Sequence, residues 1–87
     1  KRLDIDLDKN ILKKFSDFII NYNSAKLIGK NIKSIDKKDG IKINFEKNEW
    51  ILIRLSGTEP LARIYAESYD EKSVNKLISD FIESFKN

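Results

Sequence analysis

The sequence predicts a single α+β domain in which two helices pack on one face of an antiparallel sheet. Apolar residues repeat at helical spacing near both ends of the chain and alternate at strand spacing between them. Short polar turns separate the strand segments, so successive strands should pair antiparallel. The 87 residues leave room for one domain only, which spans 1–87.

The first helix is predicted over residues 8–22, where one apolar stripe recurs at steps of one and three. The stripe consists of Ile11, Leu12, Phe15, Phe18, Ile19 and Tyr22. Asp8 is a suitable N-cap, because its carboxylate can accept hydrogen bonds from the free amides of the first turn. We expect residues 1–7 to be a linker and entry strand that leads into this helix. Asp4 and Asp6 lack the glycine and terminal glutamate of a calcium loop, so no metal site is predicted there.

Four strands are predicted in the middle of the chain. They cover residues 32–36, 41–45, 50–55 and 62–68. The segment 50–55 is apolar at almost every position, which predicts a central strand covered on both faces. Between the first two strands, Asp39 and Gly40 predict a turn, since glycine tolerates a positive φ.

The last helix is predicted to follow an N-cap at Asp70. Its stripe consists of Val74, Leu77, Ile78, Phe81, Ile82 and Phe85. Four stripe aromatics should pack against the inner face of the sheet as core residues. They are Phe15, Phe18, Phe81 and Phe85.

Composition excludes several kinds of chemistry. There is no Cys and no His, which rules out disulfides, thiolate catalysis and imidazole sites within the chain. The net charge of +3 is small beside the basic field of most nucleic-acid binders. The longest apolar run, residues 50–53, is far too short for a membrane span. Because the chain has no Met at its start, we expect a fragment of a longer protein.

The segment between the last two strands has the composition of an anion site. Gly57 lets the backbone turn sharply and approach a ligand closely. Three consecutive amides from Gly57 onward can point into one concavity, which suits an anion. Ser56 and Thr58 add hydroxyl donors. This segment is therefore a candidate phosphate-binding loop.

Two arginines flank the loop, Arg54 and Arg63. Only three of the 17 basic residues are arginine, so composition alone favours lysine at both positions. A guanidinium offers a bidentate fork for phosphate, which an ammonium cannot offer. The alternative is an ordinary turn with surface ion pairs, for example from Arg63 to Glu67 or Glu59.

The run from Arg54 to Glu67 resembles the phosphate-binding loop in the C-terminal domain of the α-D-phosphohexomutases. The family pattern reads Arg-x-Ser-Gly-Thr-Glu-Pro-x-x-Arg, and each fixed position is matched. The resemblance extends over about residues 3–85, with the phosphoglucomutase/phosphomannomutase group favoured slightly. It implies the TATA-box-binding-protein-like fold, a four-stranded antiparallel sheet with helices.

The resemblance also implies a function. This domain would grip the phosphate that is not transferred while a phosphoserine elsewhere exchanges its phosphoryl group with a hexose 1-phosphate or 6-phosphate. The implied phosphate ligands are Arg54, Ser56, Gly57, Thr58 and Arg63. Glu59 would support them by orienting an arginine. The remaining three domains of the same chain would supply the phosphoserine and hold a Mg²⁺ ion.

This domain alone is expected to be inactive, with no metal or cofactor of its own. The resemblance implies a cytoplasmic protein without nucleic-acid or membrane partners. Two alternatives stay open at this point. The chain could be the corresponding domain of a phosphoglucosamine mutase, or a stand-alone module that binds phosphate or nucleic acid.

Overall fold

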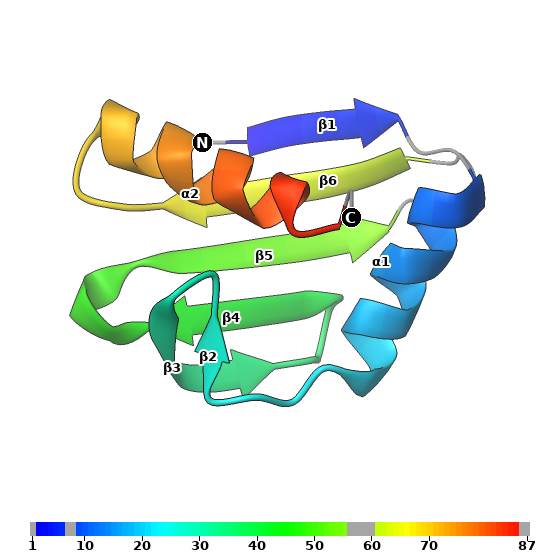
Figure 1. The fold of residues 1–87 in the computed structure, drawn as a ribbon, viewed down its shortest axis with the longest axis horizontal. Helices are drawn as coiled ribbons and strands as arrows, with labels where there is room; N and C mark the ends of the chain where they lie inside the picture. Colours follow the sequence, from blue (N-terminus) through cyan, green and yellow to red (C-terminus); the bar gives the residue numbers. More distant parts are fainter. Residues whose placement is uncertain (1, 7–8, 56–60, 86–87) are drawn as a thin grey trace.

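The computed structural model of the protein describes residues 2–6, 9–55 and 61–85 (Figure 1). The elements are β1 (Arg2–Asp6), α1 (Lys9–Asn21), β2 (Lys26–Leu27), β3 (Lys30–Asp36), β4 (Ile41–Phe45), the short 3-10 helix η1 (Glu46–Asn48), β5 (Trp50–Leu55), β6 (Leu61–Glu67) and α2 (Glu71–Glu83). The α+β class and the two helices are confirmed.

The sheet is antiparallel with the strand order β1-β6-β5-β4-β3-β2. The expected number of four strands is therefore wrong, because the described residues form a sheet of six strands. The segment expected to be a linker and entry strand forms β1, and the pairing that was not expected runs along β6 from Arg2 opposite Tyr65 to Asp6 opposite Leu61. That pairing joins residues far apart in the sequence, so local periodicity could not reveal it. The strand β2 has only two residues, which is too short for an alternating pattern to be recognised in the sequence.

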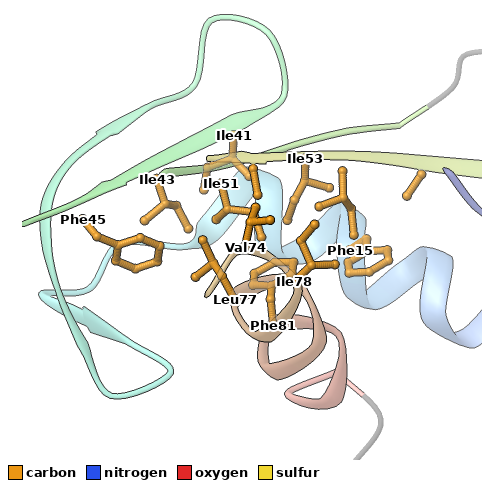
Figure 2. Packing of buried hydrophobic residues seen from close by; sticks show 13 residues of the cluster. Phe15, Ile41, Ile43, Phe45, Ile51, Ile53, Val74, Leu77, Ile78 and Phe81 are labelled. Atoms are coloured by element: carbon orange, nitrogen blue, oxygen red, sulfur yellow. The ribbon is translucent and has the colours of Figure 1, made fainter. Parts of the chain in front are cut away.

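Both helices cover the same face of the sheet, as expected (Figure 2). The fully buried strand residues alternate along β4, β5 and β6, and they meet Phe15 of α1 and four residues of α2. The buried core consists of Phe15, Ile41, Ile43, Phe45, Ile51, Ile53, Ala62, Ile64, Ala66, Val74, Leu77, Ile78 and Phe81. The rings of Phe15 and Phe81 lie parallel with centroids 6.4 Å apart, and Phe85 packs edge-on against both. The predicted core role of the stripe aromatics is confirmed.

The opposite face of the sheet is open in the described part of the chain. In β5 only Ile51 and Ile53 are buried, while Trp50 and Leu52 are half-buried and Arg54 is exposed. The expectation that this strand would be covered on both faces is wrong. The physical cause is that both helices pack on the same face of the sheet, so the opposite face carries polar and amphipathic side chains.

The helix starts agree with expectation where the structure describes them. The Asp70 carboxylate accepts a hydrogen bond from the Ser73 amide at 2.7 Å, so it is the predicted N-cap of α2. The expected cap Asp8 lies outside the described residues. Neither α1 nor α2, the two α-helices of the described chain, is long and apolar enough to span a membrane.

Candidate functional site

The two arginines singled out by the sequence lie side by side. In the pairing of β5 with β6, Arg54 stands directly opposite Arg63. Both are exposed on the face away from the helices. Side chains directly opposite across an antiparallel pair lie about 5 Å apart at Cβ, and like charges there repel. Two guanidinium groups in register at one end of a sheet are an arrangement that an anion stabilises.

The predicted loop joins these two strands at that end. Its residues Ser56, Gly57, Thr58 and Glu59 lie outside the described residues. The described residues next to it are Leu55, which ends β5, and Leu61, which begins β6. The register thus brings the two flanking arginines together, while the loop residues themselves stay predictions.

Arg54 has an acidic neighbour that the sequence did not reveal. Its Nε atom lies 3.3 Å from Oδ1 of Asp39, and both side chains are partly exposed. Asp39 belongs to the turn between β3 and β4, and that turn lies at the same end of the sheet as the C-terminal end of β5 (Figure 1). The predicted turn at Asp39 and Gly40 is confirmed, with Gly40 at φ 81°. Its contact with Arg54 is new.

Gly40 allows this turn to approach β5 closely. A Cβ atom added at Gly40 would lie 2.1 Å from the carbonyl oxygen of Ile53 and 3.1 Å from Cγ of Arg54. Real Cβ atoms essentially never come so near a backbone oxygen. Glycine is therefore required here for space as well as for its positive φ. A hollow of about 140 Å³ adjoins the turn and is lined by Asp36, Lys38, Asp39, Lys42 and Leu52.

A second polar cluster lies at the opposite end of the sheet and was not predicted. Glu49 is only 6% exposed. Its carboxylate accepts hydrogen bonds from Lys30 Nζ at 2.9 Å and from Ser68 Oγ at 2.5 Å. Burial alone would raise the pKa of Glu49, but the Ser68 hydrogen bond and the Lys30 ion pair outweigh it and hold the pKa below its usual value. Because each of its two oxygens accepts a hydrogen bond, this carboxylate stabilises the fold and is not available as a base.

The sequence contained a signal for this cluster. Glu49 has the same parity as the buried Ile51 and Ile53, and Ser68 has the same parity as the buried Ala66. If the alternation is continued by one residue before the start of β5 and by one residue after the end of β6, both polar side chains are predicted to point inward. Two inward polar groups at neighbouring strand ends predict a hydrogen-bonded pair.

The described residues bring two guanidinium groups together at one end of the sheet. They include no group of three or more acidic, histidine or cysteine side chains that could hold a metal ion. No buried side-chain nitrogen or oxygen in this part of the chain lacks a hydrogen-bond partner. What the arrangement can do is hold a multiply charged anion at the end of β5 and β6.

Comparison with known proteins agrees with the motif. The family profile described as phosphoglucomutase/phosphomannomutase, C-terminal domain, matches residues 8–84. A probable phosphoglucosamine mutase of Methanosphaera stadtmanae is 42% identical over 60% of this chain and 12% of its own length. A phosphoglucomutase/phosphomannomutase of Thermococcus kodakarensis is 41% identical over 62% of this chain and 12% of its own length.

A phosphoglucosamine mutase of Methanococcus maripaludis is 35% identical over 88% of this chain, which is 16% of the relative. The chain thus corresponds to a small part of each of these relatives. The profile match extends through nearly all the described elements, from α1 to the end of α2. The chain belongs to the phosphoglucomutase/phosphomannomutase C-terminal domain family, the C-terminal domain of phosphohexomutases.

Proposed function

We propose that this chain is the phosphate-binding domain of a phosphohexomutase and grips the phosphate that is not being transferred. The observation that carries the proposal is the cross-strand register of Arg54 and Arg63 at the end of the sheet where the loop begins. Ser56 and Thr58 would donate hydroxyl groups, and Gly57 and Thr58 their backbone amides. Glu59 would orient one of the arginines.

Gripping the distal phosphate promotes a reaction that occurs elsewhere in the cleft. Phosphoryl transfer depends mainly on positioning and charge stabilisation. Binding energy from a remote group becomes alignment at the reacting one. A site built from guanidinium groups and amides recognises the phosphate dianion and ignores the sugar ring. It therefore accepts the substrate in both orientations, as an intramolecular exchange of phosphoryl groups requires.

The remaining domains of the same polypeptide would supply the phosphoserine and the Mg²⁺ site. The described residues do not fit a metal ion, so no step proposed for this domain passes through one. In this proposal the 87-residue chain by itself is catalytically inactive, and the whole protein is cytoplasmic. The expected TATA-box-binding-protein-like fold is likewise part of the proposal, with β1 and β2 added to the four expected strands.

A second candidate concerns the sugar. Of the relatives named above, one is a phosphoglucosamine mutase and one a probable phosphoglucosamine mutase, which favours a glucosamine phosphate over a glucose or mannose phosphate. Assay of the full-length enzyme with glucose 1-phosphate, mannose 1-phosphate and glucosamine 1-phosphate separates these substrates. A kcat/KM at least tenfold higher for the glucosamine ester would assign the enzyme to the second group.

Arginine side-chain NMR tests the phosphate site directly. The chain has three arginines, so its Nε–H spectrum should contain three signals, which variants with Lys at each position would assign. On titration with inorganic phosphate at constant ionic strength, we expect the Arg54 and Arg63 signals to move most. The amides of residues 56–59 should move with them. The Kd should be about 1 mM or weaker, because one domain meets the anion from one side only.

Arg54→Lys is the matched variant, since it keeps the charge and removes the fork. It should weaken phosphate binding, and in the full-length enzyme loss of the Arg54 fork should cost about 2–4 kcal/mol in transition-state stabilisation. The proposal fails if phosphate leaves the signals of both arginines unmoved. Shifts spread over the lysine-rich surface on addition of RNA would instead favour a nucleic-acid module.

A further inference from the structure

We infer that Asp39 is a positioning residue that holds the Arg54 guanidinium in the orientation that binds phosphate. The inference rests on the proposed function, because it takes Arg54 to be a phosphate ligand. It adds a residue from a different strand connection, outside the loop motif. Three features of the structure support it: the way the turn is built, the atom of Arg54 that Asp39 contacts, and the side of β5 on which Asp39 lies.

The turn that carries Asp39 is fixed at both of its ends. At its start, the Asp36 carboxylate accepts a hydrogen bond from the Lys38 amide at 2.9 Å, which closes a local turn. At its end, Gly40 lies so close to the Ile53 carbonyl that no side chain could fit between them. The position of Asp39 relative to Arg54 therefore follows from backbone contacts and does not depend on the exposed ion pair itself.

Asp39 contacts the Nε atom of the guanidinium and not its terminal nitrogens. Asp39 Oδ1 lies next to the Nε atom of Arg54, at 3.3 Å. Arginine has five N–H donors in a planar fork, and four of them are on the two terminal nitrogens. A carboxylate at Nε thus orients the plane of the group and leaves the terminal edge for a bidentate contact with phosphate.

Asp39 and Arg63 lie on opposite sides of Arg54. The strand β5 has β4 on one side and β6 on the other. Ile41, next after the turn, is in register with Ile53, whereas Arg63 is in register with Arg54 itself. Asp39 therefore contacts Arg54 from the β4 side and offsets the repulsion between the two arginines there, whereas Arg63 lies on the β6 side.

A competing explanation makes the opposite prediction. If Asp39 were only a nearby negative charge, it would repel a phosphate dianion, and its removal would tighten binding. If it orients Arg54, its removal frees a long side chain that must then be ordered at each binding event, and binding weakens. The sign of the change distinguishes the two explanations.

The experiment compares four forms of the 87-residue chain by the arginine Nε titration with inorganic phosphate. They are the wild type, Asp39→Asn, Asp39→Glu and Asp17→Asn. For Asp39→Asn we expect the Kd to rise about threefold, despite the loss of a negative charge. Asp39→Glu should stay within about twofold of the wild type, because the carboxylate is kept in an exposed turn. Asp17→Asn makes the same charge change on the exposed surface of α1 and should leave the Kd unchanged.

A Kd for Asp39→Asn equal to or lower than that of the wild type overturns the inference. In that case the proposed function still holds, provided that the wild-type Arg54 signal responds to phosphate. If the wild-type arginine signals do not respond at all, the proposed function fails, and the inference fails with it. Amide spectra of each variant report whether the fold is kept. If Asp39→Asn does not fold, Asp39→Ser supplies the test, because it also removes the carboxylate and the same rise in Kd is expected.

Discussion

The charged side chains at the two ends of the sheet differ in exposure and in hydrogen bonding. At the loop end, Arg54 and Arg63 face each other in the open, and the Arg54–Asp39 pair has side chains that are 45% and 71% exposed. At the other end, Glu49 is buried and both its oxygens are hydrogen-bonded. A buried carboxylate whose two oxygens accept hydrogen bonds contributes to stability, whereas exposed guanidinium groups remain accessible to a ligand.

This contrast follows from the dielectric environment. A buried carboxylate that loses its partners bears the full cost of desolvation. An exposed ion pair in water is worth little, because solvent screens both charges. Substitutions at the Glu49 end should therefore change stability, and charge substitutions at the loop end should change binding. At the loop end, a large change in stability is expected only where a backbone contact and not a charge is altered, at Gly40.

The largest expected effect is that of Gly40→Ala, at the loop end. The added Cβ would meet the Ile53 carbonyl oxygen at 2.1 Å, and the residue has φ 81°. We expect the free energy of unfolding to fall by about 2–4 kcal/mol in urea denaturation. Gly29→Ala is the matched control, because Gly29 has a similar φ of 76° but nothing within 4 Å of the added atom.

In the control, the free energy of unfolding should fall by only about 1 kcal/mol, because an alanine at a positive φ is strained. Equal losses for the two variants would show that the turn relaxes away from β5 without penalty. The close approach would then not be what holds Asp39 in place. A larger loss of unfolding free energy for Gly40→Ala than for Gly29→Ala would mean that the backbone contact between Gly40 and Ile53 maintains the shape of the loop end. The exposed charges at that end would not be needed for it.

The second effect is that of Glu49→Gln, at the opposite end. The substitution keeps the shape and removes the charge that Lys30 and Ser68 stabilise. We expect a loss of about 1–2 kcal/mol in unfolding free energy at neutral pH, because Lys30 is left beside an amide. Asp80→Asn is the control, since it breaks the exposed pair with Lys76 one turn away on α2 and should cost about 0.5 kcal/mol or less. Equal costs would mean that burial adds nothing to the Glu49 pair.

The stability supplied by Glu49 should also depend on pH. Its folded-state pKa lies below 4.5, the ordinary value. As the pH falls, the unfolded chain takes up the proton first, so this stability is full above the ordinary pKa and is lost as the pH falls through the folded one. The difference in unfolding free energy between the wild type and Glu49→Gln should therefore shrink from about pH 4.5 downward. A difference that stays constant down to about pH 2.5 would contradict the lowered pKa.

The sequence predicted the parts of the fold that depend on local patterns. The stripes of α1 and α2, the alternation of β4 and the cap at Asp70 all express local periodicity or hydrogen bonding, and the structure confirms them. The place of β1 in the sheet was not predicted, because its partner β6 is distant in the sequence. The burial of β5 was overestimated, because an apolar run cannot show that both helices cover one face.

The candidate site divides in the same way. Arg54 and Arg63 were found because arginine is rare in a lysine-rich chain and the motif surrounds them. Asp39 was recognised only as a turn residue, because its neighbour Arg54 lies on a strand that the turn reaches through tertiary packing. Glu49 lies between the predicted strands 41–45 and 50–55 and was not predicted as an inward residue, although it has the same parity as the buried Ile51. Interactions between strand ends thus require the register as well as the pattern.

The smallest expected effect on stability is that of Asp39→Asn. The pair that it breaks joins Asp39, 71% exposed, to Arg54, 45% exposed, so solvent already screens most of its attraction. We expect the free energy of unfolding to change by no more than about 0.5 kcal/mol in urea denaturation, although phosphate binding weakens. A loss above about 1 kcal/mol would show that the ion pair supports the turn itself, because weaker phosphate binding would then follow from a damaged fold. A small loss together with weaker binding would place Asp39 with the ligand-binding groups and complete the contrast with Glu49.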